Sequence, residues 1–331
     1  MSQPLDLLAL GDITTDTFIR LKEAEVHCEI NNEHCTICMS WGDKIPYDSA
    51  TEVAGVGNAA NAAVSAARLG IKAGLFTWTG ADNDGNRNKD CLVSEGVDTT
   101  YLSQAEGIPS NHDYVLWYLN ERTILIKHSQ FPYALPENLI APRYLYLSSL
   151  GDPSGATHHA IAAWVKSHPE TKLMFQPGQE IGFGRELMAP VYAAAYLCVC
   201  NKEEAERVLG HTTSQDVKDL LTQITALGPT VVIITDGLNG AYAYDGTNTY
   251  KVPLYPDTRG PFERTGAGDA FASSVATALT LGKPLEEALM WGPVNSMSVV
   301  QDVGAQKGLL TRAQIEKYLV DAPAEYKLEI L

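Results

Sequence analysis

The sequence predicts an α/β fold in which a mostly parallel sheet is covered by helices on both faces and carries a small additional β-sheet. Short apolar runs typical of buried strands alternate with helical segments along most of the chain. Residues 18–52 and 110–129 break this alternation, because they hold short β-prone pieces rich in polar residues, as in a small projecting sheet. No repeat or flexible linker divides the 331 residues, so we expect a single domain, residues 1–331, with these two stretches as an excursion.

Composition narrows the classes of partner. Hydrophobic residues make up 45% of the chain and charged residues 19%, as in globular proteins. The formal net charge of −16 argues against a nucleic-acid or acidic-membrane partner, because those surfaces bind clustered Lys and Arg. No apolar run approaches the length of a membrane span and the N-terminal residues lack a basic secretion-signal region, so we expect a cytoplasmic protein.

The first predicted strand, residues 5–13, contains Gly11-Asp12 near its end. Ligands of an open α/β sheet lie beyond the carboxyl ends of the strands, so Asp12 and Asp16 are placed to meet a polar ligand. A carboxylate there can accept hydrogen bonds from hydroxyl groups. The alternative is a solvated turn acid.

The two excursions predict different local structures. Residues 114–119 and 123–127 read as a β-hairpin around Asn120-Glu121-Arg122. The first excursion holds three cysteines and two histidines, which is the ligand inventory of a zinc site. The cysteines are Cys28, Cys35 and Cys38. Because only one CxxC pair is present and the remaining spacing matches no fixed zinc pattern, free thiols are the alternative.

The alanine-rich residues 53–70 predict a helix that is entered by a glycine loop and ends at Leu69-Gly70. Residues 55–60 also fit GxGxxA, the dinucleotide fingerprint, which leaves an NAD-dependent oxidoreductase as an alternative function. That fingerprint needs a buried strand directly before it and an acid about twenty residues later. Residues 49–52 are poorly suited to a buried strand, and the first acid after the helix, Asp82, lies in a loop.

The alternation then continues to the C-terminal third. We expect strands at residues 75–80, 144–147, 173–176, 196–200 and 231–235, and helices at residues 157–166, 202–209, 270–281 and 285–300. Asn201 directly follows one strand and precedes Glu204, a pattern that is also ordinary helix capping. Residues 241–246 read as the second arm of a hairpin and its turn.

The loop before the helix at 270–281 carries the clearest chemistry. Gly266 and Gly268 leave the amides of Gly266, Ala267 and Gly268 without covering side chains, at a helix N-terminus that attracts anions and phosphate above all. Asp269 cannot pair with an anion, but it can take a proton from a hydroxyl held beside a phosphate. The loop therefore predicts phosphoryl transfer, the alternative being an ordinary turn followed by a first-turn acid.

Gly266-Ala267-Gly268-Asp269 resembles the GAGD signature of the ribokinase family, the phosphofructokinase-B type of carbohydrate kinase, and the similarity extends over about residues 5–312. The resemblance implies a ribokinase-like three-layer αβα sandwich with a β-lid at 18–52 and 110–129. It implies transfer of the γ-phosphoryl group of ATP to a hydroxyl of a sugar. In that mechanism Asp269 is the base, and the three amides stabilise the charge of the transition state.

The same resemblance assigns the other site residues. Substrate binding falls to Asp12, Asp16, Gly57 and Asn61, of which the last two match a GGxxxN element with Val56 in place of its first glycine. Nucleotide binding falls to Asn201, Thr235, Gly237, Gly240 and Asn295. Glu204 completes an NxxE motif whose acid organises Mg²⁺ through water. Glu263 takes the place of the family's aspartate and is expected near a monovalent cation, K⁺.

Several alternatives stay open at this point. The acceptor could be a nucleoside such as adenosine, which aromatic side chains of the lid would favour by stacking. These are Trp41, Tyr114, Trp117 and Tyr118. Outside this class, the alternatives are the NAD-dependent oxidoreductase and a non-catalytic sugar-binding protein. Lids of the family often pair, so a homodimer through the exposed lid edge is expected. No GxxxxGK[ST] element is present, which excludes a P-loop kinase.

Overall fold

The computed structural model describes residues 4–28, 35–119, 121–152, 154–257 and 259–331, and within them the strands form one large and two small sheets. The large sheet has ten strands in the order β16-β15-β14-β13-β12-β11-β10-β1-β6-β7. All pairs from β13 to β7 are parallel, and the β14, β15 and β16 pairs at the other edge are antiparallel. This confirms the mostly parallel sheet expected from the alternation of strands and helices.

The strands of the large sheet are short, and those at its centre are buried. They are β1 Leu7–Leu10, β6 Ala73–Gly80, β7 Leu102–Ala105, β10 Tyr144–Leu147, β11 Lys172–Phe175, β12 Ala195–Asn201, β13 Val231–Thr235, β14 Ala241–Tyr244, β15 Thr249–Val252 and β16 Glu329–Ile330. The helices are α1 Asn58–Arg68, α2 Asn83–Ser94, α3 Gly155–Ser167, α4 Arg185–Ala194, α5 Lys202–Leu209, α6 Val217–Thr225, α7 Ala267–Thr280, α8 Leu285–Val299 and α9 Arg312–Val320. In the described ranges none of the helices is both long and apolar enough for a membrane crossing.

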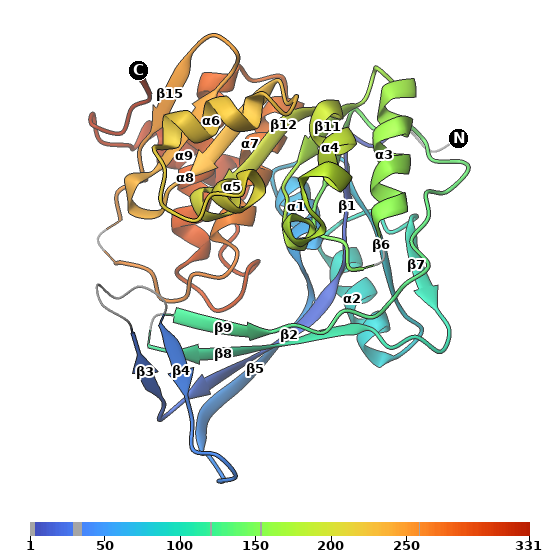
Figure 1. Ribbon diagram of the computed structural model, residues 1–331, viewed down its shortest axis with the longest axis vertical. Coiled ribbons are helices and arrows are strands. Elements are labelled where there is room, and N and C mark those ends of the chain that lie inside the picture. Colours follow the sequence, from blue (N-terminus) through green and yellow to red (C-terminus); the bar gives the residue numbers. More distant parts are fainter. Residues whose placement is uncertain (1–3, 29–34, 120, 153, 258) are drawn as a thin grey trace.

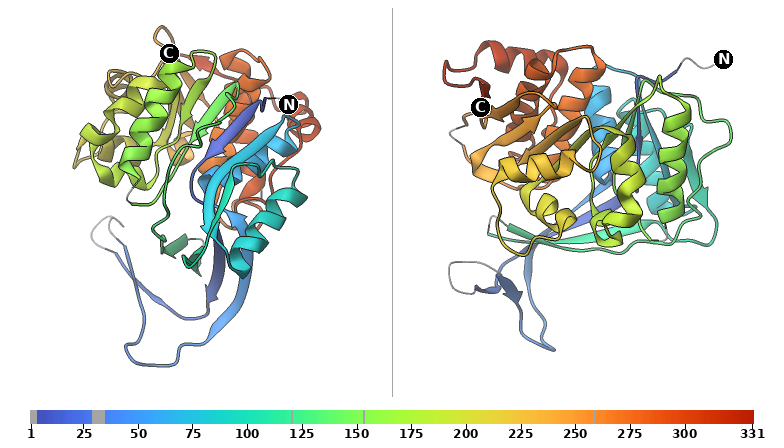
Figure 2. Two further views of the ribbon diagram at one scale, coloured as in Figure 1. Left: turned by 90° about the vertical axis from the view of Figure 1, so that its right-hand side faces the viewer. Right: turned by 45° about the horizontal axis from the view of Figure 1, so that its top comes forward.

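Helices cover both faces of the sheet (Figures 1 and 2), and a hydrophobic core lies on each face. Because successive side chains of a strand point to opposite faces, Leu7 and Ala9 of β1 join the core that contains α1, α7 and α8. Leu8 and Leu10 join the core that contains α3, α4, α5 and α6. A strand that is buried on both faces has no polar alternation, which is why β1 reads as a continuous apolar run.

A separate four-stranded sheet, the lid, projects from this body (Figure 1). Its strands are β2 Thr14–Leu21, β5 Tyr47–Val56, β8 Asn111–Tyr118 and β9 Glu121–Leu125, in the order β5-β2-β8-β9. The antiparallel pairing of β8 with β9 confirms the predicted hairpin. A third sheet pairs β3 Glu25–His27 with β4 Thr36–Cys38 beyond the end of β2. Both stretches that interrupt the alternation in the sequence therefore build the small sheets.

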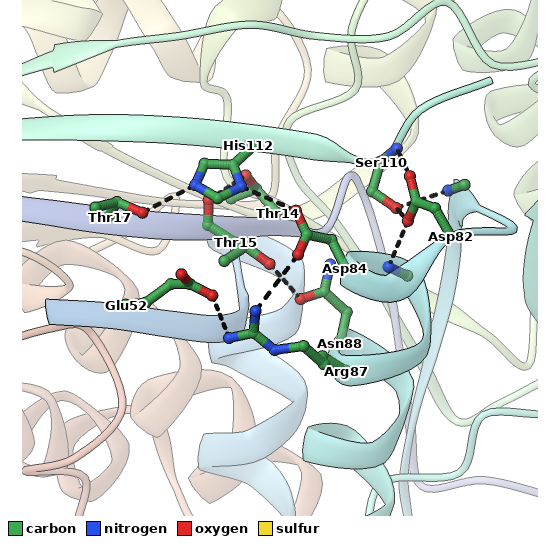
Figure 3. A network of polar contacts seen from close by, with 12 residues as sticks. Thr14, Thr15, Thr17, Glu52, Asp82, Asp84, Arg87, Asn88, Ser110 and His112 are labelled. Carbon is green, nitrogen blue, oxygen red and sulfur yellow. Dashed lines mark hydrogen bonds and ion pairs between the residues drawn. The ribbon is translucent and has the colours of Figure 1, made fainter.

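The start of α2 fastens the lid to the body (Figure 3). Asn88 Oδ1 accepts a hydrogen bond from Thr15 Oγ1 of β2 at 2.9 Å. The His112 ring of β8 lies between the Asp84 carboxylate at 2.9 Å and Thr17 Oγ1 at 2.9 Å. These contacts join α2, β2 and β8 at the root of the lid, so α2 holds the first residues of both lid strands in place.

The cysteines of the lid do not form the predicted zinc site. Cys28 and Cys35 are joined by a disulfide, and Cys38 is an exposed free thiol. Within the described ranges no group of three or more metal-ligating side chains is found. The zinc prediction is corrected, and its alternative of free thiols holds for Cys38 but not for Cys28 and Cys35, because inventory and spacing do not reveal which two sulfurs lie close enough to bond. Residues 29–34, between the two bonded cysteines, lie outside the described residues.

The dinucleotide fingerprint lacks its structural context. The strand before α1 is β5, which is antiparallel to β2 in the lid and mostly exposed. A dinucleotide site needs a buried parallel strand that delivers its phosphate loop to the edge of the main sheet. The NAD-dependent alternative therefore has no support in this fold.

Candidate active site

A cavity of about 490 Å³ lies between the body and the lid, at the carboxyl ends of the parallel strands. It receives Asp12 from the end of β1, Gln176 from the end of β11, Asn201 from β12 and Thr235 from β13. The first turn of α7 forms another part of its wall. This is the position at which an open α/β sheet binds its ligands, and the volume suits a small-molecule site.

Helix α7 begins at the predicted anion loop. Its N-cap is Gly266, whose φ of +83° lies in the left-handed region. A Cβ at Gly266 would come within 2.6 Å of Ala305 Cα, so only glycine fits there. A Cβ at Gly268 would meet nothing within 4 Å, which leaves the mouth of the helix open. The helix begins three residues before the predicted start, and Asp269 therefore lies inside its first turn.

The amides of this turn face the cavity with few competing acceptors. The Ala267 amide donates to the Arg264 carbonyl at 3.4 Å. Among the described residues, no acceptor is found for the amides of Gly266 and Gly268. Open donors at the positive end of a helix dipole are suited to hold a phosphate.

The Asp269 carboxylate is buried in this wall and held by three amide donors from separate elements. Asn58 Nδ2 and Gln176 Nε2 donate to Oδ1, each at 2.9 Å, and Asn61 Nδ2 donates to Oδ2 at 2.7 Å. Gln176 accepts in turn from the hydroxyl of Tyr146. These donors orient the carboxylate toward the cavity, and the sequence reasoning missed Asn58 and Gln176 as partners of Asp269.

Asp12 forms the opposite end of the cavity. Its carboxylate accepts from the Tyr133 hydroxyl at 2.9 Å and from the Gly151 amide at 2.8 Å, and it lies 3.0 Å from His128 Nδ1. His128 and Tyr133 are more than 110 residues away in the chain, so no local spacing could have found them. The only signal for His128 was its place near the end of the predicted lid stretch 110–129.

Asp16 lies beside three other carboxyl groups. Burial raises the pKa of Asp16 to about 7, and the negative charges of Asp113, Glu263 and Asp269 contribute to the shift. Asp113 is the register partner of Asp16 on the neighbouring strand β8, and burial raises its pKa as well. Two neighbouring carboxyl groups in one cavity resist simultaneous ionisation, so this end of the site titrates near neutral pH.

We expect the Michaelis constant for the acceptor to fall about tenfold between pH 6 and pH 8, because ionised Asp16 accepts two hydrogen bonds from hydroxyl groups.

The same pKa shift of Asp16 should lower the free energy of unfolding as the pH rises. A raised pKa means that the folded protein binds more protons than the unfolded chain, so stability decreases as the pH rises from about 4 to about 7. Asp16→Asn should remove both dependences. Steady-state kinetics and urea unfolding at several pH values check this, and an unchanged pH profile in Asp16→Asn would assign the titration to another group.

Two predicted substrate residues have roles that the structure makes specific. Gly57 has a φ of +114°, and a Cβ there would lie 2.7 Å from the Asp12 carbonyl oxygen. Asn61 lines the cavity, but its amide nitrogen is bound to Asp269 and its carbonyl oxygen accepts from Gln306 Nε2 at 3.0 Å. In this structure Asn61 positions Asp269, and its contact with the acceptor stays a prediction, because the amide nitrogen carries a second hydrogen.

The predicted nucleotide residues divide into two groups. Asn201 and Thr235 line the cavity. Gly237 and Gly240 lie in the turn before β14, and a Cβ at Gly240 would lie 2.3 Å from the Val252 carbonyl oxygen. The need for glycine at position 240 therefore follows from the turn itself, as the hairpin alternative held.

Glu204 combines capping with a place at the cavity. Its carboxylate accepts a hydrogen bond from the backbone amide of Asn201 at 2.9 Å. In return, Asn201 Oδ1 accepts one from the backbone amide of Glu204 at 2.7 Å, which completes a capping box. Burial raises the pKa of Glu204. A single carboxylate beside an open cavity fits Mg²⁺, which keeps several waters and takes phosphate oxygens as further ligands.

Asn295 and Glu263 are both held by contacts inside the protein. Asn295 is fully buried in α8 and does not line the cavity, because its side chain bonds Ser274 Oγ at 2.8 Å and accepts from the Leu310 amide at 2.9 Å. Glu263 is buried too, and its carboxylate accepts from the amide and hydroxyl of Thr265. Glu263 thus braces the anion loop, and its expected place near a monovalent cation stays a prediction.

Comparisons with known proteins agree with this geometry. A model described as pfkB family carbohydrate kinase matches residues 33–312. The chain is 26% identical over 275 residues to ribokinase of Bacillus subtilis (strain 168), covering 80% of this chain and 87% of that protein. It is 25% identical over 319 residues to nucleoside kinase of Methanothermobacter thermautotrophicus, covering 93% and 94%. The structure of Arabidopsis thaliana ribokinase complexed with ribose and ATP has the same fold, with a TM-score of 0.78 at 19% identity over 96% of this chain and 99% of that chain.

Proposed function

The chain belongs to the pfkB family of carbohydrate kinases, and we propose that Asp269 is the base with which it transfers the γ-phosphoryl group of ATP to a sugar hydroxyl. The protein is an ATP-dependent carbohydrate kinase, and the assignment of individual residues is the proposal. One observation carries it: the Asp269 carboxylate shares a cavity with Asp12 and Asp16, directly at the open N-terminus of α7.

In the proposed reaction, Asp12 and Asp16 accept hydrogen bonds from hydroxyls of the sugar and hold one hydroxyl near Asp269. The carboxylate of Asp269 takes the proton as the oxygen forms a bond to the γ-phosphorus. The bond between this phosphorus and the oxygen that bridges it to the β-phosphate breaks, and ADP leaves. The amides of Gly266, Ala267 and Gly268 stabilise negative charge on the moving group.

Mg²⁺ belongs to this proposal through Glu204, a carboxylate that lines the cavity next to Asn201. When bound, the ion neutralises charge on the donor phosphates. Glu204 would hold the ion through water, since Glu204 Oε2 already accepts a hydrogen bond from the backbone amide of Asn201. The lid excludes water, which would otherwise compete with the sugar as phosphoryl acceptor.

A nucleoside acceptor is the second candidate, because the nucleoside kinase of M. thermautotrophicus is similar over most of this chain. The expected aromatic platform does not favour it. Trp41 is fully exposed, and Trp117 packs edge-on against Phe262 with the Arg20 guanidinium over its ring. Within the described ranges the cavity is lined by neither of these rings, nor by Tyr114 or Tyr118. A sugar, which needs mainly hydrogen bonds, fits the polar wall better.

A coupled assay of ADP release over pentoses, hexoses, keto-deoxy acids and nucleosides tests the function. We expect turnover with a member of the sugar groups. Turnover with nucleosides alone would reverse the order of the two candidates. Absence of ADP release with every acceptor would contradict the proposed reaction.

A homodimer through the lid is also part of this proposal. The lid face that points away from the cavity carries apolar side chains in register, including Ile19 opposite Leu116 and Tyr114 opposite Leu125. Tyr114 is 45% exposed and Leu125 is 52% exposed. An apolar sheet face of this kind is suited to pair with the same face of a second copy.

We expect Leu116→Lys to convert the dimer to a monomer, because it places an unpaired charge at the centre of the interface. Analytical ultracentrifugation measures the change. Val320→Lys is the control, since Val320 is 84% exposed on α9, far along the chain from the lid. A wild-type protein that sediments as a monomer at all concentrations would contradict the dimer.

A further inference from the structure

The lid face toward the cavity changes chemistry in steps along its strands. The strand register places Asp16 opposite Asp113, then Val115 opposite Ile124, and then Trp117 opposite Arg122. Each step is two residues, roughly 7 Å at about 3.3 Å per residue. From the root of the lid outward, this inner face is therefore acidic, then apolar, then cationic.

Strand β9 and the residues after it bring this gradient into the cavity. Alternate side chains line the cavity: Arg122, Ile124, Ile126 and His128. His128 lies at the inner end, where it contacts Asp12. Ile124 and Ile126 supply an apolar wall between the hydroxyl-binding acids and the arginine. A ligand that filled this length would need a polar head, an apolar middle and a group that pairs with a guanidinium.

The guanidinium of Arg122 has no partner for this role within the described part of the chain. Its Nε is buried and makes no hydrogen bond there, and no acidic side chain of the described residues pairs with it. The neighbouring Glu121 pairs instead with Arg264 at 3.2 Å. Arg20 lies opposite Trp117 in the same cross-strand row as Arg122, but it has partners. Its guanidinium lies over the Trp117 ring at 4.9 Å and within 3.8 Å of Asp48. A buried donor that lacks a partner is costly unless a ligand supplies one.

We propose that the acceptor carries a carboxylate, which Arg122 binds, so that the substrate class is a sugar acid or a sugar joined through an apolar linker to an acid. This inference rests on the proposed function and names the acceptor of that same site. The hydroxylated end lies at Asp12 and Asp16, the aliphatic part lies along Ile124 and Ile126, and the carboxylate pairs with the planar guanidinium. The donor phosphates bind on the other wall, at the N-terminus of α7 with Arg264 beside it.

Two matched pairs of acceptors test the carboxylate. D-gluconate and D-glucitol differ only at one terminal carbon, and 6-(fructosylamino)hexanoate and fructosyl-hexylamine differ only at the end of an aliphatic linker. In at least one pair, we expect the acid to have a Michaelis constant about 10- to 100-fold below that of the partner that lacks the carboxylate. Arg122→Met should remove this preference without changing the Michaelis constant for ATP, and Arg122→Lys should retain part of it.

Arg20→Met is the matched control, because it removes a cation from the same row of the lid, but not one that lines the cavity. It should leave the preference for the acid unchanged, and thermal melts should show that all three variants are folded. If the wild type has equal Michaelis constants for both members of each pair, the inference is overturned while the kinase function stands. A preference for the acid that persists in Arg122→Met also overturns the inference. The same holds if Arg122→Met raises the Michaelis constant for ATP with both members of a pair. Absence of ADP release with every acceptor overturns the proposed function itself and the inference with it.

Discussion

Asp269→Asn is expected to lower kcat by about 10²- to 10⁴-fold, the range that a positioned general base contributes. The amide cannot take the proton of the acceptor hydroxyl. It also exposes an NH₂ group to the donors that now face the carboxylate, Asn58, Asn61 and Gln176. The binding of ADP should change little, because the phosphates are proposed to bind through backbone amides. Steady-state kinetics and calorimetric titration with ADP measure the two effects separately.

Asp219→Asn is a control for the helix-dipole alternative. Asp219 is also an acid in the first turn of a helix, α6, but it is exposed and lies outside the cavity. If both acids served only the helix dipole, both variants would lose a similar small amount of stability and keep full activity. Comparable turnover by Asp269→Asn and the wild type would refute Asp269 as the base.

Gly266→Ala is expected to lower kcat/KM by more than 100-fold and to destabilise the fold. The new Cβ would lie 2.5 Å from Ala305 Cβ and 2.6 Å from Ala305 Cα, so the loop or the backbone at 305 has to move. Moving the loop displaces the amides that are proposed to hold the phosphoryl group, and a shift of about 1 Å at such a site can cost roughly 100-fold in rate. Kinetics and urea unfolding measure the two losses.

Gly282→Ala separates the clash from the cost of the backbone conformation. Gly282 lies just after the same helix and has a φ of +82°, nearly that of Gly266, but its Cβ would meet nothing within 4 Å. Alanine at either position destabilises the fold by the strain of a left-handed conformation, of the order of 1–3 kcal/mol. Only Gly266→Ala adds the clash, so equal losses of stability and activity in the two variants would contradict the proposed role of the loop.

Local patterns in the sequence were enough to predict many elements. The helix at residues 202–209 and the strands at 144–147 and 231–235 have the predicted bounds, because each is a short, strongly apolar or well-capped segment. The two arms of the lid hairpin pair as predicted, but β9 already begins at Glu121, so Glu121 and Arg122, which were expected in the turn, belong to the strand. Boundaries were less accurate where glycine lies at the start of a helix, as at Gly155 of α3 and at Gly266 and Gly268 around the start of α7, because glycine has no strong local preference.

The partners of the site residues were not predictable in this way. Asn61 was expected at the acceptor, but its hydrogen bond to Asp269, 208 residues later in the chain, was not foreseen. Asn295 was expected at the nucleotide and is instead bonded within the core. In each case the residue type was compatible with both roles, and the choice depended on which donors and acceptors the fold brought within 3 Å.

The sequence by itself therefore determined the order of strands and helices, the excursion of the lid and the identity of the anion loop, because periodicity and glycine placement act over a few residues. Tertiary structure alone decided that Asp12, Asp16 and Asp269 share one cavity, that two lid cysteines bond to each other, and that Arg122 points into the cavity. Those outcomes depend on contacts between residues far apart in the chain, whose geometry no local pattern records.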